Sequence, residues 1–304
     1  MNQHIPPQSV RRWTGPYLGN YYGTLWKTFN IDLDAEEGKI KLGSRLLSVA
    51  DTTDTNLLNL GTITTFLRTD ADCLDRYWGL NRSGRLVKTD TTANRTNPYS
   101  ATWDEDTLLN TPTDARDMAV HENDSDSASG HNQLFVTRDT DINVLNDTGN
   151  EVWVANWWGT TKGMTALSQG LKTGVPHPIT HFPLVRKALI GDGNKVHTID
   201  KSETISYAAL TLPSYLEVQH IFNSNRRAWI LCKHLFDGLG VVVEWDGSST
   251  TYNQIHALTS PYPLAGVAYG ETPIIITIKG EILEFNGNGF VPMMRNGQKI
   301  AFPI

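Results

Sequence analysis

The chain has 304 residues, of which 39% are hydrophobic and 19% are charged. This balance is that of a globular protein with a sizeable core and excludes an intrinsically disordered chain. The formal net charge is −6, so electrostatics give no reason to expect nucleic acid as a partner. The apolar runs are shorter than a bilayer is thick, and no membrane span is expected.

Residues 1–27 are expected to form an extended arm, because they are rich in Pro, Gly, Asn and Tyr. Tyr17, Tyr21 and Tyr22 of this arm are candidate residues for contact with a partner. The arm lacks a basic stretch followed by an apolar core, so we expect no signal peptide. With two cysteines in the whole chain, folding in a reducing cytoplasm is the expectation.

Residues 28–60 contain a predicted β-hairpin. Apolar and polar residues alternate over 28–33 and again over 39–42, with turn-forming residues between them. This pattern indicates a two-stranded ribbon with one apolar face. An isolated hairpin is not stable in water, so the ribbon must lie on the rest of the chain or on another protein. It either closes the ring or forms a sixth blade, or it docks on a neighbouring subunit.

Residues 61–304 repeat a short phrase five times: an apolar run that ends at Asp or Asn. The plainest copies are 241–247 (VVVEWDG) and 281–287 (EILEFNG). The anchor residues of the copies, spaced by 56, 54, 46 and 40 residues, are Asp90, Asn146, Asp200, Asp246 and Asn286. A period of roughly 40 to 50 residues built from short strands is that of a propeller blade.

The segments around each anchor supply further strands, so that each unit has four. Two more β-branched or aromatic runs precede every anchor, and a last run follows some of them. No long stretch shows the 3.6-residue period of an amphipathic helix. We therefore predict an all-β fold, a β-propeller of five blades, or six if the hairpin contributes one. The continuous apolar runs suit inner strands that are covered on both faces, and the outer strands should alternate.

The sequence contains few signs of catalysis. The Gly-x-Ser-x-Gly motif is absent, and four histidines lie in or beside apolar runs, where core or edge roles are expected: His121, His181, His197 and His220. Four acidic residues belong to the repeat and are expected to support turns: Asp192, Asp246, Glu244 and Glu284. The polar segment 122–130 lacks the closing carboxylate of a Ca²⁺ loop and is interpreted as a connection. We expect no enzymatic activity, no cofactor and no metal.

The aromatic segment 153–158 contains three tryptophans. Trp153 alternates inward with its strand, but Trp157 and Trp158 cannot both be buried on one face of one strand. We expect one of the pair either to lie in a contact surface, for a sugar or a protein partner, or to cap the mouth of the channel. Cys73 and Cys232 are expected to be buried free thiols.

The repeat phrases resemble units of β-propeller proteins encoded by tailed bacteriophages. The resemblance lies in 190–200 (IGDGNKVHTID), 243–249 (VEWDGSS) and 280–287 (GEILEFNG), and in the opening 28–33 (TFNIDL) followed by 38–40 (GKI). It implies a structural protein of the virion, in the tail, assembled in the host cytoplasm with other tail proteins and with copies of itself. A receptor- or glycan-binding propeller at the tail tip, using Trp157 and Trp158, is the alternative. The resemblance supplies no catalytic residues.

Overall fold

The computed structural model describes residues 31–36, 39–42, 60–66, 76–81, 84–89, 103–122, 132–147, 151–165, 169–295 and 298–301. These residues form an all-β structure, as the sequence predicts, and one π-helical turn, η5 (Trp157–Thr161), is the helical element among them. No helix within these ranges has the length and hydrophobicity needed to cross a membrane.

Five four-stranded antiparallel sheets follow one another along the chain. Sheet 1 consists of β3 (Leu60–Phe66), β4 (Arg76–Asn81), β5 (Leu86–Thr89) and β6 (Trp103–Glu105). Sheet 2 consists of β7 (Asp117–Glu122), β8 (Asn132–Thr137), β9 (Ile142–Asp147) and β10 (Glu151–Val154). Sheet 3 consists of β11 (Ile179–Phe182), β12 (Lys187–Asp192), β13 (Lys195–Asp200) and β14 (Ile205–Thr211).

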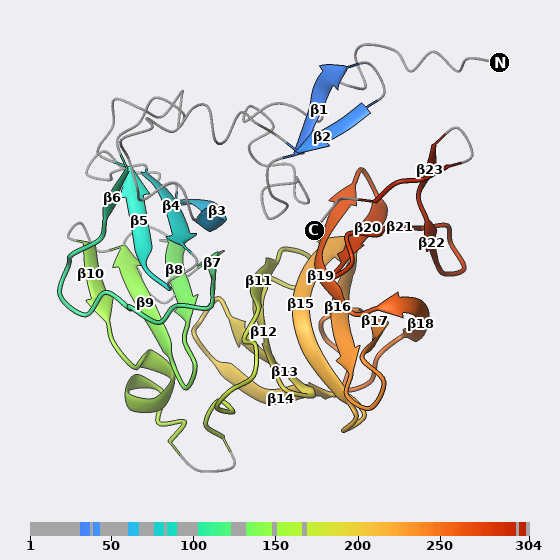
Figure 1. The fold of residues 1–304 in the computed structure, drawn as a ribbon. Helices are drawn as coiled ribbons and strands as arrows, with labels where there is room; N and C mark the ends of the chain where they lie inside the picture. The colour runs from blue at the N-terminus through green and yellow to red at the C-terminus, as the bar shows by residue number, and fades with distance from the viewer. Residues whose placement is uncertain are drawn as a thin grey trace.

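Sheet 4 consists of β15 (Leu216–Ser224), β16 (Arg227–His234), β17 (Leu239–Trp245) and β18 (Gln254–Pro261). Sheet 5 consists of β19 (Pro263–Tyr269), β20 (Thr272–Thr277), β21 (Ile282–Phe285) and β22 (Phe290–Pro292). In every sheet the strands pair in chain order. Figure 1 shows the sheets as successive units of an arc, with sheet 1 at one end and sheet 5 at the other.

The first strand of each sheet packs against the first strand of the next, so β3, β7, β11, β15 and β19 form the inner edge of the arc. The four-stranded units and their order agree with the prediction of a propeller. The repeat register is also confirmed for the four anchors that the structure describes, which lie in or directly after the third strands: Asn146 in β9, Asp200 in β13, Asp246 after β17 and Asn286 after β21. Asp90 lies outside the described residues.

Two shorter hairpins flank the five sheets in the sequence. β1 (Ile31–Glu36) pairs with β2 (Lys39–Leu42), so the predicted hairpin is present, although its first strand continues to Glu36, past the expected end at residue 33. At the other end, β23 (Met294–Arg295) pairs with β24 (Gln298–Lys299). The arm residues 1–27 lie outside the described ranges.

The core consists of separate apolar layers between successive sheets. Sheets 1 and 2 meet at a cluster that includes Trp78 and Trp153, and their rings make an edge-on contact with centroids 5.9 Å apart. Further clusters fill the layers between sheets 2 and 3, 3 and 4, and 4 and 5. We call these four layers the seams.

The middle strands of sheets 2, 3 and 4 are apolar on both faces because each of them borders two seams. In β12, Leu189 belongs to the seam with sheet 4, whereas Ala188 and Ile190 belong to the seam with sheet 2. All three side chains are fully buried. The outer strand β18 alternates between buried and exposed positions over residues 256–259, as expected. The outer strand β14 does not alternate, because Leu210 is its one buried position.

The anchor residues act as turn supports wherever their side chains are described. The Asp246 carboxylate accepts hydrogen bonds from the amides of Ser248 and Ser249 at 2.7 and 2.8 Å. Asn286 does the same for the two residues at the equivalent place, Asn288 and Gly289. Asp and Asn therefore alternate in the repeat because either side chain can satisfy these amides.

Trp245 provides a test of the seam between sheets 3 and 4. Its side chain is fully buried in that seam. The substitution Trp245→Ala should lower the free energy of unfolding by about 3–5 kcal/mol, because a large cavity would remain. Chemical denaturation checks this value, with Tyr252→Ala, at a 37% exposed side chain, as the control. A loss below about 1 kcal/mol for Trp245→Ala would contradict burial between sheets.

Candidate functional site

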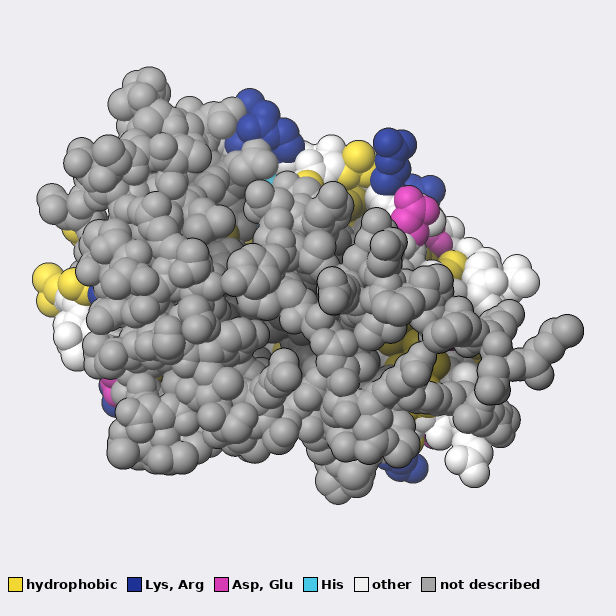
Figure 2. Space-filling view, turned by 90° about the horizontal axis from the view of Figure 1, so that it is seen from above, with side chains coloured by type: hydrophobic (Ala, Val, Ile, Leu, Met, Phe, Trp, Pro, Cys, Tyr) yellow, Lys and Arg dark blue, Asp and Glu magenta, His cyan; other side chains and the backbone are white. Residues whose placement is uncertain are grey.

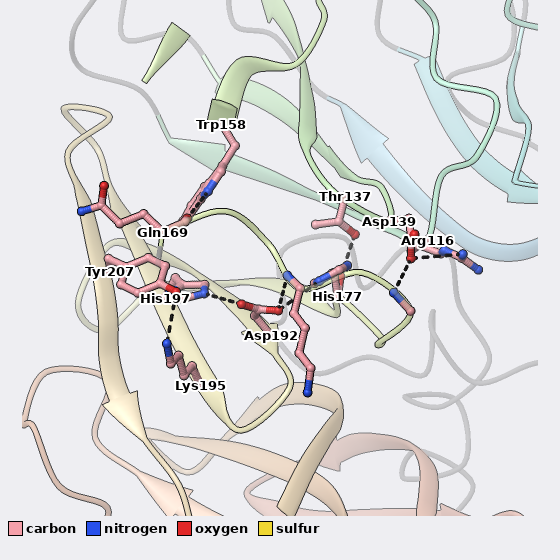
Figure 3. Close-up of polar contacts among 12 residues, drawn as sticks. Arg116, Thr137, Asp139, Trp158, Gln169, His177, Asp192, Lys195, His197 and Tyr207 are labelled. Carbon is pink, nitrogen blue, oxygen red and sulfur yellow. Dashed lines mark hydrogen bonds and ion pairs between the residues drawn. The ribbon is translucent and has the colours of Figure 1, made fainter. Parts of the chain in front are cut away.

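A buried polar network is centred on Asp192, at the end of β12 (Figure 3). Its carboxylate faces two histidine rings, with 3.2 Å to Nε2 of His177 and 3.2 Å to Nε2 of His197. The backbone amide of Lys172 donates a third hydrogen bond at 2.9 Å. Asp192 thus joins the sheet 3 hairpin to the segment that precedes β11.

The expectation that Asp192 merely supports a turn is wrong. The Asp192 side chain is 4% exposed and both histidine side chains are fully buried. The adjacent turn is made by Gly193, whose φ of 57° is in the left-handed region that glycine tolerates. The carboxylate lies between two donors, His177 and His197 (Figure 3).

The local electrostatics fix the ionised state of Asp192. Burial alone would raise the pKa of this carboxyl, but the hydrogen bonds from His177, His197 and the Lys172 amide outweigh burial and hold the pKa below its ordinary value. Burial also lowers the pKa of His197, although Asp192 opposes this effect. The folded protein therefore contains a carboxylate beside a neutral His197.

The hydrogen bonds of His197 define its tautomer. The amide of Ala208 donates to Nδ1 at 2.8 Å, so Nδ1 has no proton and Nε2–H donates to Asp192. Ala208 has a φ of 49°, and the pairing of β13 with β14 shifts register beside it. The His197 ring stacks on Tyr207, with centroids 4.4 Å apart, and also contacts Trp158.

This arrangement stabilises the fold and does not favour catalysis. Both nitrogens of His197 are hydrogen-bonded within the chain, which leaves neither in reach of a substrate proton. The expectation of a satisfied core histidine is confirmed for His197. His121 and His181 contact each other across sheets 2 and 3, with 3.0 Å between their Nδ1 atoms, and His220 is also buried.

Trp157 and Trp158 are both buried, with 2% and 0% of their surfaces exposed. The expectation that one of them lies in an exposed contact surface or caps the channel mouth is wrong. The chain leaves β10 in the π-helical turn η5, so the two side chains do not alternate as they would in a strand. Asp141 holds this turn by accepting the amides of Trp158 and Gly159, and burial raises the pKa of Asp141 despite these bonds.

Two buried carboxylates bridge neighbouring sheets. Asp106, which follows β6, accepts Nε1–H of Trp153 from sheet 2 at 2.7 Å and pairs with Lys88 of β5 at 2.7 Å. Asp117 of β7 accepts the amide of Ile179 in sheet 3 at 3.0 Å. The acidic groups with the least solvent exposure therefore bind neighbouring segments of the same chain.

The remaining sequence-based predictions concern the two cysteines, the tyrosines of the arm and the polar segment. Cys232 is a buried free thiol, as expected, and burial raises its pKa. Cys73, Tyr17, Tyr21, Tyr22 and the polar segment 123–130 lie outside the described residues. Within the described part of the chain, no group of three or more His, Cys, Asp or Glu residues could hold a metal ion.

The strongest candidate contact surface is at one end of sheet 4. Its exposed apolar side chains, which we call the Phe236 patch, are Tyr215, Leu235, Phe236 and Leu239, with exposed fractions of 40%, 46%, 84% and 37%. The patch includes the turn between β16 and β17 and the residue that precedes β15 by one position. This patch was not predicted, although the apolar pair Leu235-Phe236 directly before the turn residues Asp237-Gly238 was a usable signal.

The turn that carries Phe236 is held by Asp237. The Asp237 carboxylate accepts the Leu239 amide at 2.9 Å and lies 2.7 Å from Nδ1 of His234. The His234 ring contacts those of Tyr215 and Phe236, with centroid distances of 5.1 and 5.7 Å. Because this turn is ordered by its own hydrogen bonds, binding a partner there costs little conformational entropy.

Elsewhere on the surface, positively and negatively charged side chains are mixed. On the face that Figure 2 shows from above, Lys and Arg side chains lie in separate groups near the rim, with Asp and Glu side chains beside one of them. Charges of one sign therefore do not gather into a single field among the described residues visible on this face.

Comparison with known proteins gives distant structural likenesses. No family model matches the chain, and no curated protein matches it. A crystal structure of BBS1N in complex with ARL6DN, soaked with lead, aligns with a TM-score of 0.43 and 14% identity over 76% of this chain and 66% of that one. A second, soaked with mercury, aligns with a TM-score of 0.42 and 13% identity over 72% and 61%. The chain spans less than two thirds of the length of these chains.

The Asp192 network predicts a specific loss of stability. Asp192→Asn places an amide N–H against a histidine N–H, so one buried donor loses its acceptor. The free energy of unfolding should fall by about 1–3 kcal/mol. Asp246→Asn is the matched control and should change it by less than about 0.5 kcal/mol, because Asn286 already supports the equivalent turn. Equal losses for the two variants in denaturation experiments would contradict the network.

The lowered pKa values of His197 and His256 predict acid sensitivity. Below about pH 6.5 the unfolded chain binds protons that these two folded histidines do not. The free energy of unfolding should therefore fall as the pH drops below this value. Denaturation experiments between pH 7.5 and 5.5 measure the slope of the free energy of unfolding against pH. This slope should be smaller for His197→Gln. An unchanged slope in that variant would show that His197 is not a source of the effect.

Proposed function

We propose that this chain is a structural, protein-binding β-propeller of a bacteriophage tail. The observation that carries the protein-binding part is the Phe236 patch, where an 84% exposed Phe ring is presented on a turn ordered by Asp237. A rigid aromatic side chain that projects from a surface is typical of an anchor that fills a partner's pocket. The assignment to a phage tail is supported by the resemblance of the repeat phrases.

In this proposal the buried acidic and histidine side chains have structural roles. Asp192, His197, Asp106 and Asp117 are engaged in hydrogen bonds within the chain. A propeller of this kind acts through its surfaces, because its fold alone defines no chemistry. The partners proposed are other tail proteins and further copies of this chain.

A glycan receptor is the second candidate for the same patch. The rings of Tyr215 and Phe236 flank the His234–Asp237 pair, so apolar faces and polar atoms lie together. Aromatic faces with nearby hydrogen-bonding groups suit a sugar ring. This alternative replaces Trp157 and Trp158, which are buried.

The association of the native chain tests the protein-binding proposal. Light scattering and electron microscopy of the purified protein should show a symmetric particle larger than the 33.8 kDa monomer. Phe236→Ser should weaken that association at least about tenfold without changing the midpoint of unfolding by more than a few degrees. Leu109→Ser, at an equally exposed side chain outside the patch, is the control and should associate normally.

Two outcomes would contradict the proposal. Equal association of wild type and Phe236→Ser would show that the patch is not the contact surface. A monomer that binds no isolated tail particle, but binds a sugar on a glycan array through Phe236, would favour the receptor-binding alternative.

A further inference from the structure

A buried histidine, His256, lies in the aromatic part of the seam between sheets 4 and 5. It belongs to the outer strand β18 and is 5% exposed. Its ring stacks on Trp229 of sheet 4, with centroids 5.9 Å apart. Two rings of sheet 5, Phe285 and Phe290, meet it edge-on with centroids 5.2 and 6.0 Å away. The imidazole therefore contacts both sheets and helps to join them.

The Nε2 atom of His256 is buried and has no hydrogen-bond partner. Oε2 of Glu244, on the neighbouring strand β17, is 3.9 Å from it, which is too far for a hydrogen bond. The other oxygen of this carboxylate, Oε1, is 2.9 Å from Nε of Arg227. Arg227 thus holds the carboxylate that a protonated His256 would need as its counter-charge.

Few other charged groups face this imidazole. Sheet 4 presents Glu244 and, paired with it, Arg227. Sheet 5 presents the two phenylalanine rings, because Glu284 lies on the opposite face of β21 with its cross-strand partner Ile274. The other histidine of sheet 4 that lies in a seam-facing strand, His220, is on β15, three strands away across the sheet, or about 14 Å.

A proton on His256 would place a positive charge between two sheets. Burial lowers the pKa of His256, and the attraction of Glu244 opposes this effect without cancelling it. The folded protein therefore keeps this ring neutral at pH values where an unburied histidine, with a pKa of about 6.5, is already charged. As the pH falls below this value, a state in which the ring reaches water binds an extra proton and gains stability relative to the closed seam.

The seam between sheets 1 and 2 provides a contrast. No histidine is among the core residues that the structure describes there. Histidine is the side chain whose charge ordinarily changes between pH 5 and 8. This seam should therefore not respond to pH in that range.

We propose that His256 makes the contact between sheets 4 and 5 pH-sensitive, so that this seam opens more often in mild acid while the seam between sheets 1 and 2 does not. Arg227 sets the sensitivity, because it occupies the carboxylate that would otherwise stabilise the protonated ring. This inference does not depend on the proposed function, since it concerns a single chain.

Native-state hydrogen exchange of the full chain at pH 7.5 and 5.5 tests the proposal. Low concentrations of denaturant distinguish the opening of one sheet, which exposes little surface, from global unfolding. The protection factors of β20 and β21 against local opening should fall about three- to tenfold at the lower pH, tenfold being the limit for one proton over the pH unit below 6.5. Those of β4 and β5 should be the same at both pH values.

Three variants give the effect a sign. His256→Phe keeps a ring in the seam and takes no proton, so its protection factors in sheet 5 should not depend on pH. Arg227→Gln frees Glu244 for the protonated ring and should reduce the fall, whereas Glu244→Gln removes the counter-charge and should bring it closer to the limit. The matched control is Arg226→Gln, at the exposed neighbouring position, which should behave like wild type.

Several results would overturn the proposal. Equal protection of β20 and β21 at the two pH values in wild type would show that the seam does not respond to acid. A fall of wild-type size in His256→Phe would show that another group is responsible. If His256→Phe fails to fold, Arg227→Gln and Glu244→Gln decide, because shifts of the same sign in both would contradict competition for the carboxylate.

Discussion

The close approach of successive sheets is the constraint on which the rest of this structure depends. At the seam between sheets 4 and 5, a Cβ atom on Gly266 would overlap the ring of Phe222. Between sheets 3 and 4, a Cβ on Gly191 would lie 2.6 Å from Val218. The sheets can be this close only where small residues face large ones, and the large residues then contact two sheets. Close packing of this kind stabilises each seam.

Burial on both faces of the middle strands determines how the polar side chains are used. At exposed strand ends, Asp246 and Asn286 bind turn amides. At buried positions a carboxylate must be satisfied by several donors, because an unpaired buried charge is costly. Asp192 meets this need with two histidines and an amide, and Asp106 with a lysine and a tryptophan. These networks join sheets and connecting segments that the apolar seams alone would not orient.

Structural features that depend on residues close together in the chain can be predicted from the sequence. Features that depend on contacts between distant residues cannot. The strands and the repeat register follow from local apolar runs and turn residues, so both could be predicted. The burial of Trp157 and Trp158 depends on a turn held by Asp141, which lies before β9. The role of Asp192 depends on His177, 15 residues upstream. The Phe236 patch consists of residues from two separate loops, so its extent is visible only in the fold.

The most direct test of the seams is a double-mutant cycle across sheets 4 and 5. Gly266→Ala should strongly destabilise the wild-type protein, because the new methyl group has no space beside the Phe222 ring. In a Phe222→Leu background the same change should cost at least about 1 kcal/mol less, since the smaller side chain makes room for it. Free energies of unfolding that add within about 0.3 kcal/mol would show that the two residues do not meet, and would contradict the close packing of successive sheets.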